Sequence, residues 1–337
     1  MHRSSVVQRR DGGRNPARGT VLRRCHLAGS DLITASADEA SAGAPQLDAF
    51  ETALEPISVA YGMGVDSTAM LVGMRRLGIR PDLILFADTG GELPETIAYG
   101  EQVLRPWLRA IGFPDLIVVR YRPRHGRYTT LEENCTTLKT LPSLAYGRKA
   151  CSAKWKIQPQ QRYEATWHPA QRAWAAGGRV EKWIGYDAGP KDMRRGHELR
   201  DSVRYRYVYP LRLWGWDRPR CVREIMDDTE LIAIATQAGL SPVPRKSACW
   251  FCPSNTTDDV RYIVDNHPGL ADRIIEMETA ARPGLRVIQG LWRRPRKGTR
   301  GTEPRPGSMS EFIASYRRTR LLPHAQTEPA EPQRKAA

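Results

Sequence analysis

The chain has 337 residues, 40% of them hydrophobic and 26% charged, and carries a formal net charge of +15 at pH 7. This length and hydrophobic content suffice for one substantial core and a smaller appended lobe. The positive charge predicts an anionic partner, either a nucleotide or a nucleic acid, with solubility as the simpler alternative. No apolar run approaches the roughly twenty residues of a membrane-spanning helix, and the N-terminal arginines lack the apolar stretch of a secretory signal. We therefore expect a cytoplasmic protein with no membrane partner.

Residues 1–50 are rich in Arg, Ser, Gly and Ala without apolar periodicity, which predicts a disordered basic tail. The folded part begins with a β-branched apolar run over residues 57–61. This run breaks at Gly62 and Gly64, and apolar residues at helical spacing resume from Met70. The pattern predicts a strand, a tight glycine loop and a helix.

The predicted loop suits a bound phosphate, because glycines allow close approach and the free N–H groups of a helix start attract anions. It lacks the lysine of a Walker A motif, which excludes that kind of nucleotide site. An ordinary strand-to-helix turn capped by Asp66 or Ser67 is the alternative that the loop alone leaves open.

Two further strand-and-helix units follow. The apolar run 83–87 ends in the polar stretch 88–96, a helix is expected from Pro94 to about Ile111, and residues 116–121 form a third strand. Three such units in a row predict an α/β fold with a doubly wound, mainly parallel sheet flanked by helices. Because ligands bind outside the carboxyl ends of parallel strands, the loops after the first two strands should share one edge of the sheet.

These two loops carry a resemblance to a known family. Residues 64–67 (Gly-Val-Asp-Ser) resemble the end of the Ser-Gly-Gly-x-Asp-Ser pyrophosphate loop of the adenine nucleotide α-hydrolase superfamily, the PP-loop ATP pyrophosphatases. Residues 88–96 are similar to the Asp-Thr-Gly-x-x-x-Pro-Glu-Thr segment of its phosphoadenosine phosphosulfate reductase branch. The resemblance covers about residues 56–260. Gly62 and Met63 stand where the family has Ser and Gly, so one hydroxyl contact is missing.

The resemblance implies a site for an adenine nucleotide, ATP or adenylyl sulfate, with Mg²⁺ placed by Asp66. Lys154 and Lys156 follow Cys151 in a Cys-x-x-Lys-x-Lys-x-x-Pro pattern similar to the family's, although a solvated basic face would look alike. The catalytic candidates are Asp66, Ser67 and Lys154. The residues expected to bind the nucleotide are Tyr61, Gly62, Gly64, Asp66, Ser67, Thr68, Asp88, Thr89, Gly90, Glu92, Lys156, Gly185, Arg194 and Arg195.

The later part of the chain completes the sheet and adds a helical lobe. Residues 180–186 predict a fourth strand, followed by Asp187 where family members often carry an arginine. A helix is expected from Arg218 with Asp217 as its N-cap. Residues 261–293 are expected to form a helical C-terminal extension. The Pro-, Gly- and Arg-rich residues 294–337 predict a flexible tail.

Four cysteines are candidates for a metal centre. Cys249 and Cys252 form a Cys-x-x-Cys pair, which presents two thiolates to one metal. Cys151 occupies the place of the cluster cysteines in the resembling family, and Cys221 or Cys135 is the candidate fourth ligand. The resemblance implies a [4Fe-4S] cluster. Sulfur ligands alone leave zinc open, and reduced thiols without metal are the remaining alternative.

The resemblance implies an enzyme of sulfur transfer or sulfonucleotide reduction, the latter with a thioredoxin-like reductant. The reductases end in a Glu-Cys-Gly-Leu/Ile-His motif, whereas residues 294–337 contain no cysteine, so a covalent thiosulfonate is unsupported. The alternative reaction is ATP-dependent thiolation of tRNA or DNA with a sulfur donor. A third hypothesis, from another class, is a non-catalytic nucleic-acid-binding protein with structural zinc.

Overall fold

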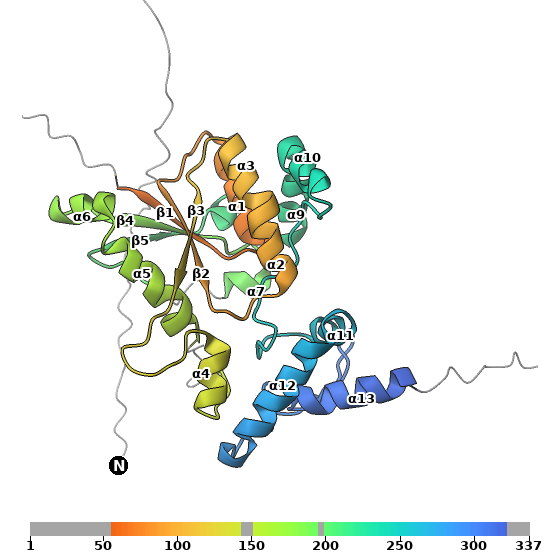
Figure 1. The fold of residues 1–337 in the computed structure, drawn as a ribbon. Coiled ribbons are helices and arrows are strands. Elements are labelled where there is room, and N and C mark those ends of the chain that lie inside the picture. The colour runs from red at the N-terminus through yellow and green to blue at the C-terminus, as the bar shows by residue number, and fades with distance from the viewer. Residues whose placement is uncertain (1–54, 143–150, 195–198, 322–337) are drawn as a thin grey trace, which may run out of the picture. The chain divides into compact units, whose positions relative to one another are not determined.

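The computed structural model describes residues 55–142, 151–194 and 199–321, which all belong to one compact unit. At its centre lies a parallel sheet of five strands in the order β3-β2-β1-β4-β5 (Figure 1). The strands are β1 (Ile57–Tyr61), β2 (Leu83–Asp88), β3 (Leu116–Arg120), β4 (Val180–Ile184) and β5 (Tyr205–Val208). The predicted α/β class with a doubly wound parallel sheet is confirmed.

Helices cover both faces of the sheet, as expected where parallel strands are joined by helical crossovers. The helices and turns before residue 190 are α1 (Val65–Arg76), α2 (Pro94–Tyr99), the π-turn η1 (Gly100–Leu104), α3 (Arg105–Ala110), α4 (Leu131–Thr137), the π-turn η3 (Ser152–Ile157), α5 (Gln158–Glu164) and α6 (His168–Ala175). Those that follow are α7 (Pro190–Met193), α8 (Pro210–Leu213), α9 (Arg218–Met226), α10 (Thr229–Gln237), α11 (Thr257–Asn266), α12 (Pro268–Ala281), the short 3₁₀ turn η4 (Arg282–Gly284) and α13 (Met309–Leu321).

The main core lies on the face of the sheet that α1, α3, α9 and α10 cover, and α5 and α6 cover the other face (Figure 1). All six residues of β2 are buried, as its continuous apolar run predicts. Asp217 caps α9 by accepting a hydrogen bond from the Arg220 N–H at 2.9 Å, as predicted. Every helix among the described residues is too short or too polar to span a bilayer.

The order of the strands decides where a ligand can bind. The chain moves outward from β1 through β2 to β3 and then crosses to the opposite side of β1 to form β4. Adjacent loops therefore leave the carboxyl ends of β1 and β4 in opposite directions, and such a topological switch point is where open α/β sheets bind their ligands.

The helix predicted from Pro94 to Ile111 is divided. It runs as α2, the π-turn η1 and α3 without interruption of the chain. Gly100 opens the π-turn, and a Cβ atom there would lie 2.5 Å from the Cε atom of Met63. The absence of a side chain at Gly100 therefore leaves room for the buried Met63 of the first loop.

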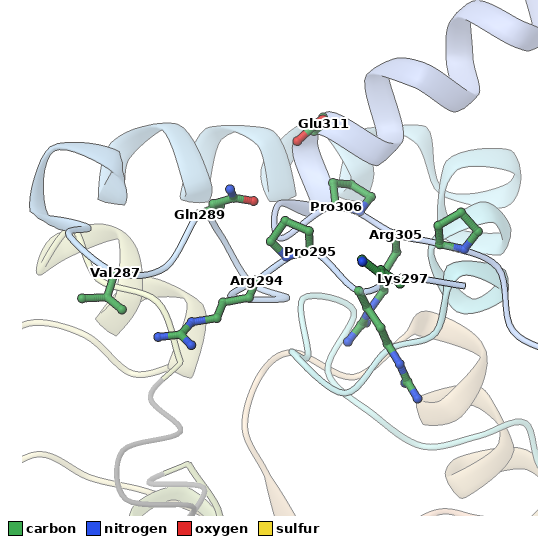
Figure 2. A pocket seen from close by; sticks show the side chains of 10 residues that line it. Val287, Gln289, Arg294, Pro295, Lys297, Arg305, Pro306 and Glu311 are labelled. Carbon is green, nitrogen blue, oxygen red and sulfur yellow. The ribbon is translucent and has the colours of Figure 1, made fainter. Parts of the chain in front are cut away.

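The expectation of a flexible tail from residue 294 is wrong for the part that the structure describes. Residues 309–321 form α13, and Met309 and Ile313 are fully buried in the C-terminal core with α11 and α12. Residues 294–306 line a hollow of about 900 Å³ next to the start of α13 (Figure 2). The predicted N-terminal tail and residues 322–337 lie outside the described residues.

Candidate functional site

The loop between β1 and α1 is shaped by one unusual residue. Met63 has φ of +57°, the left-handed region that L-residues other than Gly rarely adopt, and its side chain is buried. Met63 stands where the resembling family has glycine, and its packing beside Gly100 holds it in this left-handed conformation.

Two residues predicted to bind nucleotide belong to the support of this loop. The hydroxyls of Tyr61 and Thr68 are buried and lie 2.8 Å apart in a hydrogen bond, and Thr68 also donates to the Gly64 carbonyl. Ser67 donates to the same carbonyl at 3.0 Å. These bonds fix the first turn of α1, whose leading N–H groups have no intrahelical acceptor and suit an anion.

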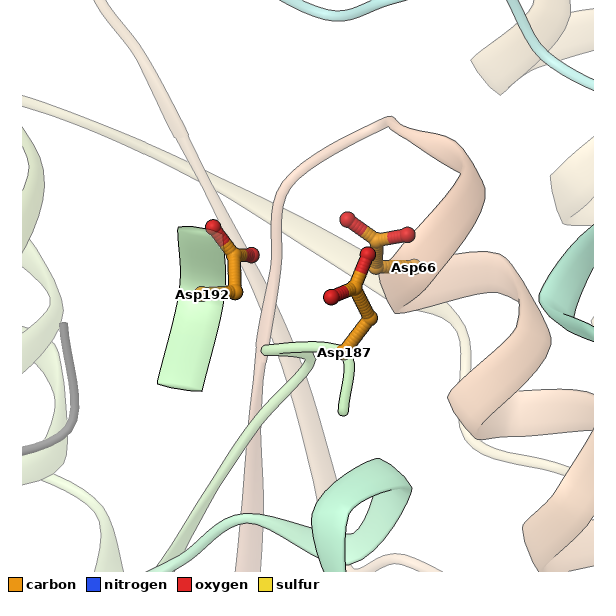
Figure 3. A group of neighbouring side chains, drawn as sticks. All are labelled: Asp66, Asp187 and Asp192. Carbon is orange, nitrogen blue, oxygen red and sulfur yellow. The ribbon is translucent and has the colours of Figure 1, made fainter. Parts of the chain in front are cut away.

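Three aspartates gather at the switch point. Asp66 is the second residue of α1, Asp187 follows β4, and Asp192 lies in α7; one carboxylate oxygen from each falls within 4.8 Å of the others. Figure 3 shows the three carboxylates at the end of the first loop, with Asp66 and Asp187 side by side. Among the described residues, this is the one group of three or more His, Cys, Asp or Glu side chains this close together.

Hydrogen bonds hold two of these carboxylates in place, and the negative charges of the three carboxylates repel one another. Asp66 accepts a hydrogen bond from the Arg218 guanidinium of α9 at 2.7 Å, and Asp187 accepts one from the Gly189 N–H at 2.8 Å. Burial raises the pKa of Asp66; Arg218 opposes this shift, and the neighbouring Asp187 and Asp192 add to it. A divalent cation would relieve this repulsion, and carboxylate oxygens are the ligands that Mg²⁺ prefers. The residues present therefore fit the magnesium ion that the resemblance implies.

The sequence predicts only part of this cluster. The loop motif indicates Asp66, whereas Asp187 stands out only as a departure from the resembling family, Arg218 only as the start of a helix, and Asp192 not at all. A usable signal was present, because Asp187 and Asp192 follow a strand whose carboxyl end lies at the same edge as that of β1. Gly185, predicted to bind the nucleotide, allows the exit of β4 to pack closely against α1. A Cβ atom on Gly185 would lie 2.9 Å from the Ser67 N and Cα atoms.

The loop after β2 points to the cysteines rather than to the aspartates. Asp88 accepts hydrogen bonds from Arg120 and from the Gly90 N–H, and the Thr89 hydroxyl lies 3.0 Å from the Cys249 sulfur. We expected Asp88 and Thr89 to face the nucleotide, and the structure places both in these other contacts. A Cβ atom on Gly90 would lie 2.4 Å from Thr130, the N-cap of α4, so that glycine permits close packing.

Glu92 connects the two loops to the cysteine turn. Its buried carboxylate accepts a hydrogen bond from Ser247 at 3.2 Å and lies 3.6 Å from the Lys156 ammonium. Ser247 in turn lies against the first loop, since a Cβ atom on Gly64 would be 3.7 Å from the Ser247 Cβ. The first loop, the second loop and the segment before Cys249 are therefore adjacent.

Three of the predicted metal ligands surround Lys156. Burial lowers the pKa of Lys156, but Glu92, Cys249, Cys252 and Cys151 outweigh burial and raise it overall. Burial also raises the pKa of Cys249 to about 12, with Glu92 adding to the shift and Lys156 opposing it. A metal or cluster that binds here must displace the thiol protons.

The fourth candidate thiol is decided by position. Cys221 lies in α9 and belongs to the main core, where Asp66 and Asp187 are the charges that act on it. Cys135 of α4 shares the second core with Cys151, Cys249 and Cys252, and Cys151 acts on its pKa. Of the two candidates for a fourth ligand, Cys135 thus shares a core with the other three cysteines, whereas Cys221 lies in a different one.

The cysteines do not converge on a single point. A tetrahedral zinc ion with Zn–S bonds of about 2.3 Å needs sulfurs about 3.8 Å apart, and no three cysteine sulfurs of the described chain lie within 4.8 Å of one another. The five described cysteines also form no disulfide. The Lys156 ammonium, on which these three thiols act, suits an anionic group with sulfur ligands such as the iron–sulfur cluster that the resemblance implies.

Lys154, Gly62, Arg194 and Arg195 are the remaining predicted residues. The Lys154 ammonium lies over the Tyr121 ring at 4.9 Å and over the Tyr128 ring at 5.7 Å, a cation–π arrangement. Gly62 and Arg194 are exposed, and Arg195 falls outside the described residues. The structure thus brings together the first loop, the exit of β4 and the cysteine turn, and leaves Lys154 in an aromatic setting beside Cys151.

No family model and no curated protein matches this chain.

Proposed function

We propose that this protein is an adenine-nucleotide-binding enzyme of the PP-loop type that acts in sulfur transfer. One observation carries the proposal: Asp66, Asp187 and Asp192 meet at the switch point of a parallel sheet, beside the N-terminus of α1. Glycine loop, helix start and carboxylate cluster are together the parts that a magnesium–nucleotide site needs.

Each part has a role in this proposal. The first-turn amides of α1 and the Ser67 hydroxyl bind the phosphates, and preorganised donors of this kind stabilise charge that develops there. Mg²⁺ held by the three aspartates would neutralise the phosphate oxygens. Arg218 favours the ionised form of Asp66, and its hydrogen bond orients the carboxylate.

The cysteine turn supplies the link to sulfur chemistry. Cys151, Cys249 and Cys252 would hold the iron–sulfur cluster, with Cys135 as the candidate fourth ligand. Lys156 offsets the negative charge of the thiolates, and Ser247 connects this turn to the first loop.

Two reactions compete within this proposal. In ATP-dependent thiolation, a carbonyl oxygen of the target attacks the α-phosphorus, pyrophosphate leaves, and a hydrosulfide-class donor then displaces AMP. The acidic cluster favours this reaction. It would hold Mg²⁺, and a triphosphate carries more negative charge for that ion to neutralise than adenylyl sulfate does. The segment 88–96 and Lys154 favour reduction of an adenylyl sulfate, which rests on the resemblance.

The proposal is tested by changing a carboxylate of the cluster. We expect Asp187→Asn to weaken binding of a fluorescent ATP analogue by about tenfold or more in the presence of Mg²⁺, and to have little effect in EDTA, because a neutral amide is a poorer ligand for a hard cation. Asp227→Asn at the exposed end of α9 is the matched control. Pyrophosphate release with ATP and tRNA or DNA then separates the two reactions. Equal Mg²⁺-dependent affinity in both variants would refute the site.

A further inference from the structure

Most of the positive charge of the chain lies in its folded part. Residues 1–54 contain seven basic and six acidic side chains, and residues 322–337 contain two of each. Between residues 282 and 305, by contrast, eight basic side chains accompany a single acid, Glu303. A net charge of +7, nearly half of the formal charge of +15, is thus concentrated in 24 residues that the structure describes.

These residues form a defined hairpin rather than a tail. Arg296 and Arg305 exchange two backbone hydrogen bonds at 2.8 and 3.0 Å, and Thr299 and Thr302 exchange two at 2.9 Å. We call residues 294–305 the basic hairpin. Its backbone is fixed by these pairs, so its side chains project from a stable support.

The cations of the basic hairpin lack carboxylate partners. Arg294, Arg296, Lys297 and Arg300 are exposed, and within the described chain none has an acid at ion-pair distance. The acid of the hairpin, Glu303, is held by Arg261 at 2.5 Å. Burial and the neighbouring Arg296 both lower the pKa of Arg305, a sign of positive charge without compensation.

Several other cations of the same lobe are paired. Arg261, Arg273 and Arg317 each contact a carboxylate. The basic hairpin instead opens a hollow of about 900 Å³ that four cations line, with prolines forming part of its wall (Figure 2). A surface that concentrates unpaired cations around an open hollow suits a polyanion.

The base of the hairpin is connected to the cysteine turn through Asn255. The backbone carbonyl of Asn255 accepts hydrogen bonds from the Arg305 guanidinium at 3.3 Å and from the Trp292 indole at 2.8 Å. The Asn255 amide donates to the carbonyls of Cys249 and Trp250 at 3.2 and 2.9 Å. Asn255 therefore joins the two segments, with its backbone carbonyl bound to the hairpin base and its side-chain amide bound to the turn that carries Cys249 and Cys252.

We propose that the basic hairpin binds the phosphodiester backbone of a nucleic acid and holds it beside the cysteine turn. Seven of the eight cations between residues 282 and 305 are arginines, whose planar guanidinium matches phosphate in a bidentate manner better than lysine does. Binding to nucleic acid follows from the hairpin alone. Presentation of that nucleic acid for thiolation rests on the proposed function.

The test compares two variants that each lose four positive charges, one in the basic hairpin and the other elsewhere on the surface. One variant of the full chain changes Arg294, Arg296, Lys297 and Arg300 to Gln, and its control changes the exposed Arg109, Arg172, Arg223 and Arg318 to Gln. Both have the same net charge. Binding to a fluorescent 24-base-pair DNA duplex and to an RNA duplex of equal length is measured by anisotropy between 50 and 300 mM KCl, with poly-L-glutamate as the comparison polyanion.

We expect the hairpin variant to bind both duplexes about tenfold or more weakly than the control, with a slope of log K against log salt that is about three units smaller. Equal affinities and slopes for the two variants, or equal binding of poly-L-glutamate and duplex by the unchanged protein, would overturn the proposal. Duplex binding through the hairpin without any pyrophosphate release would leave the hairpin proposal standing and count against the thiolation reaction. Duplex-dependent pyrophosphate release that persists in the hairpin variant would count against the hairpin proposal and leave the thiolation reaction standing.

Discussion

At the scale of single residues, the balance of charge around Asp66 is the most informative feature. Its carboxylate lies between one cation, Arg218, and two carboxylates, Asp187 and Asp192. Burial and the two acids favour the protonated form, and Arg218 favours the ionised form. A carboxyl in this position responds to pH above the range of an ordinary aspartate.

This balance predicts a pH dependence for the nucleotide site. The pKa of Asp66 is raised from 3.8, and a protonated carboxyl is a poor ligand, so Mg²⁺-dependent ATP affinity should fall as pH is lowered, starting above the titration range of a free aspartate. Arg218→Gln removes the cation that opposes the shift, so the loss should begin at higher pH, whereas Arg218→Lys keeps the charge. Binding titrations from pH 8 to 4.5 check this, and overlapping profiles for Arg218→Gln and the unchanged protein would contradict it.

At the scale of secondary structure, the site depends on close backbone contact between α1 and the exit of β4. Gly185 lies against Ser67 with no room for a Cβ atom, while the nearest atom to a Cβ on Gly62 is the Ser67 Oγ at an ordinary 3.8 Å. The two glycines therefore differ in purpose. Gly185 permits close packing, whereas Gly62 lies in the loop with room for a Cβ atom.

A matched pair of substitutions tests this distinction. Gly185→Ala forces the backbone of β4 away from α1 and should lower the free energy of unfolding by about 1–3 kcal/mol and weaken nucleotide binding. Gly62→Ala meets no close atom and should change stability by less than about 0.5 kcal/mol. Urea unfolding of both variants gives the values. The interpretation fails if the two substitutions have equal effects.

At the scale of the whole described unit, one buried carboxylate joins the start of α13 to the rest of the C-terminal core. Glu278 of α12 accepts hydrogen bonds from the N–H groups of Leu291, Met309 and Ser310 and from the hydroxyls of Ser308 and Ser310. Its donors include the residues that start α13 and the segment that precedes the basic hairpin. The carboxylate thus organises the region that carries the hairpin.

Glu278→Gln should destabilise this region by about 2–4 kcal/mol, because the amide NH₂ of glutamine would face donors that now bind a carboxylate oxygen. Glu276→Gln, on the exposed face of the same helix, is the control and should lie within about 0.5 kcal/mol of the unchanged protein. Chemical denaturation followed by circular dichroism measures both. Equal midpoints would show that the five hydrogen bonds contribute little.

Local sequence determined much of the architecture. The continuous apolar run of β2, the glycines of the first loop and the Asp217 cap depend on neighbours in the chain, so strands and helices could be placed from pattern alone. Asp66 and the Cys249–Cys252 pair were likewise visible as motifs. In each case, the pattern that indicates the element lies within a few residues of the chain.

Tertiary structure decided the rest, because the physical cause lies far away in the chain. Asp187 and Asp192 become part of a site only because β4 crosses to lie beside β1, and Thr89 contacts Cys249 across 160 positions. Cys135 rather than Cys221 lies near the other thiols because α4 and α9 belong to different cores. The Arg- and Pro-rich segment from residue 294 has the composition of a tail, and it is ordered by Glu278 and Asn255, whose contacts with it no local pattern could reveal.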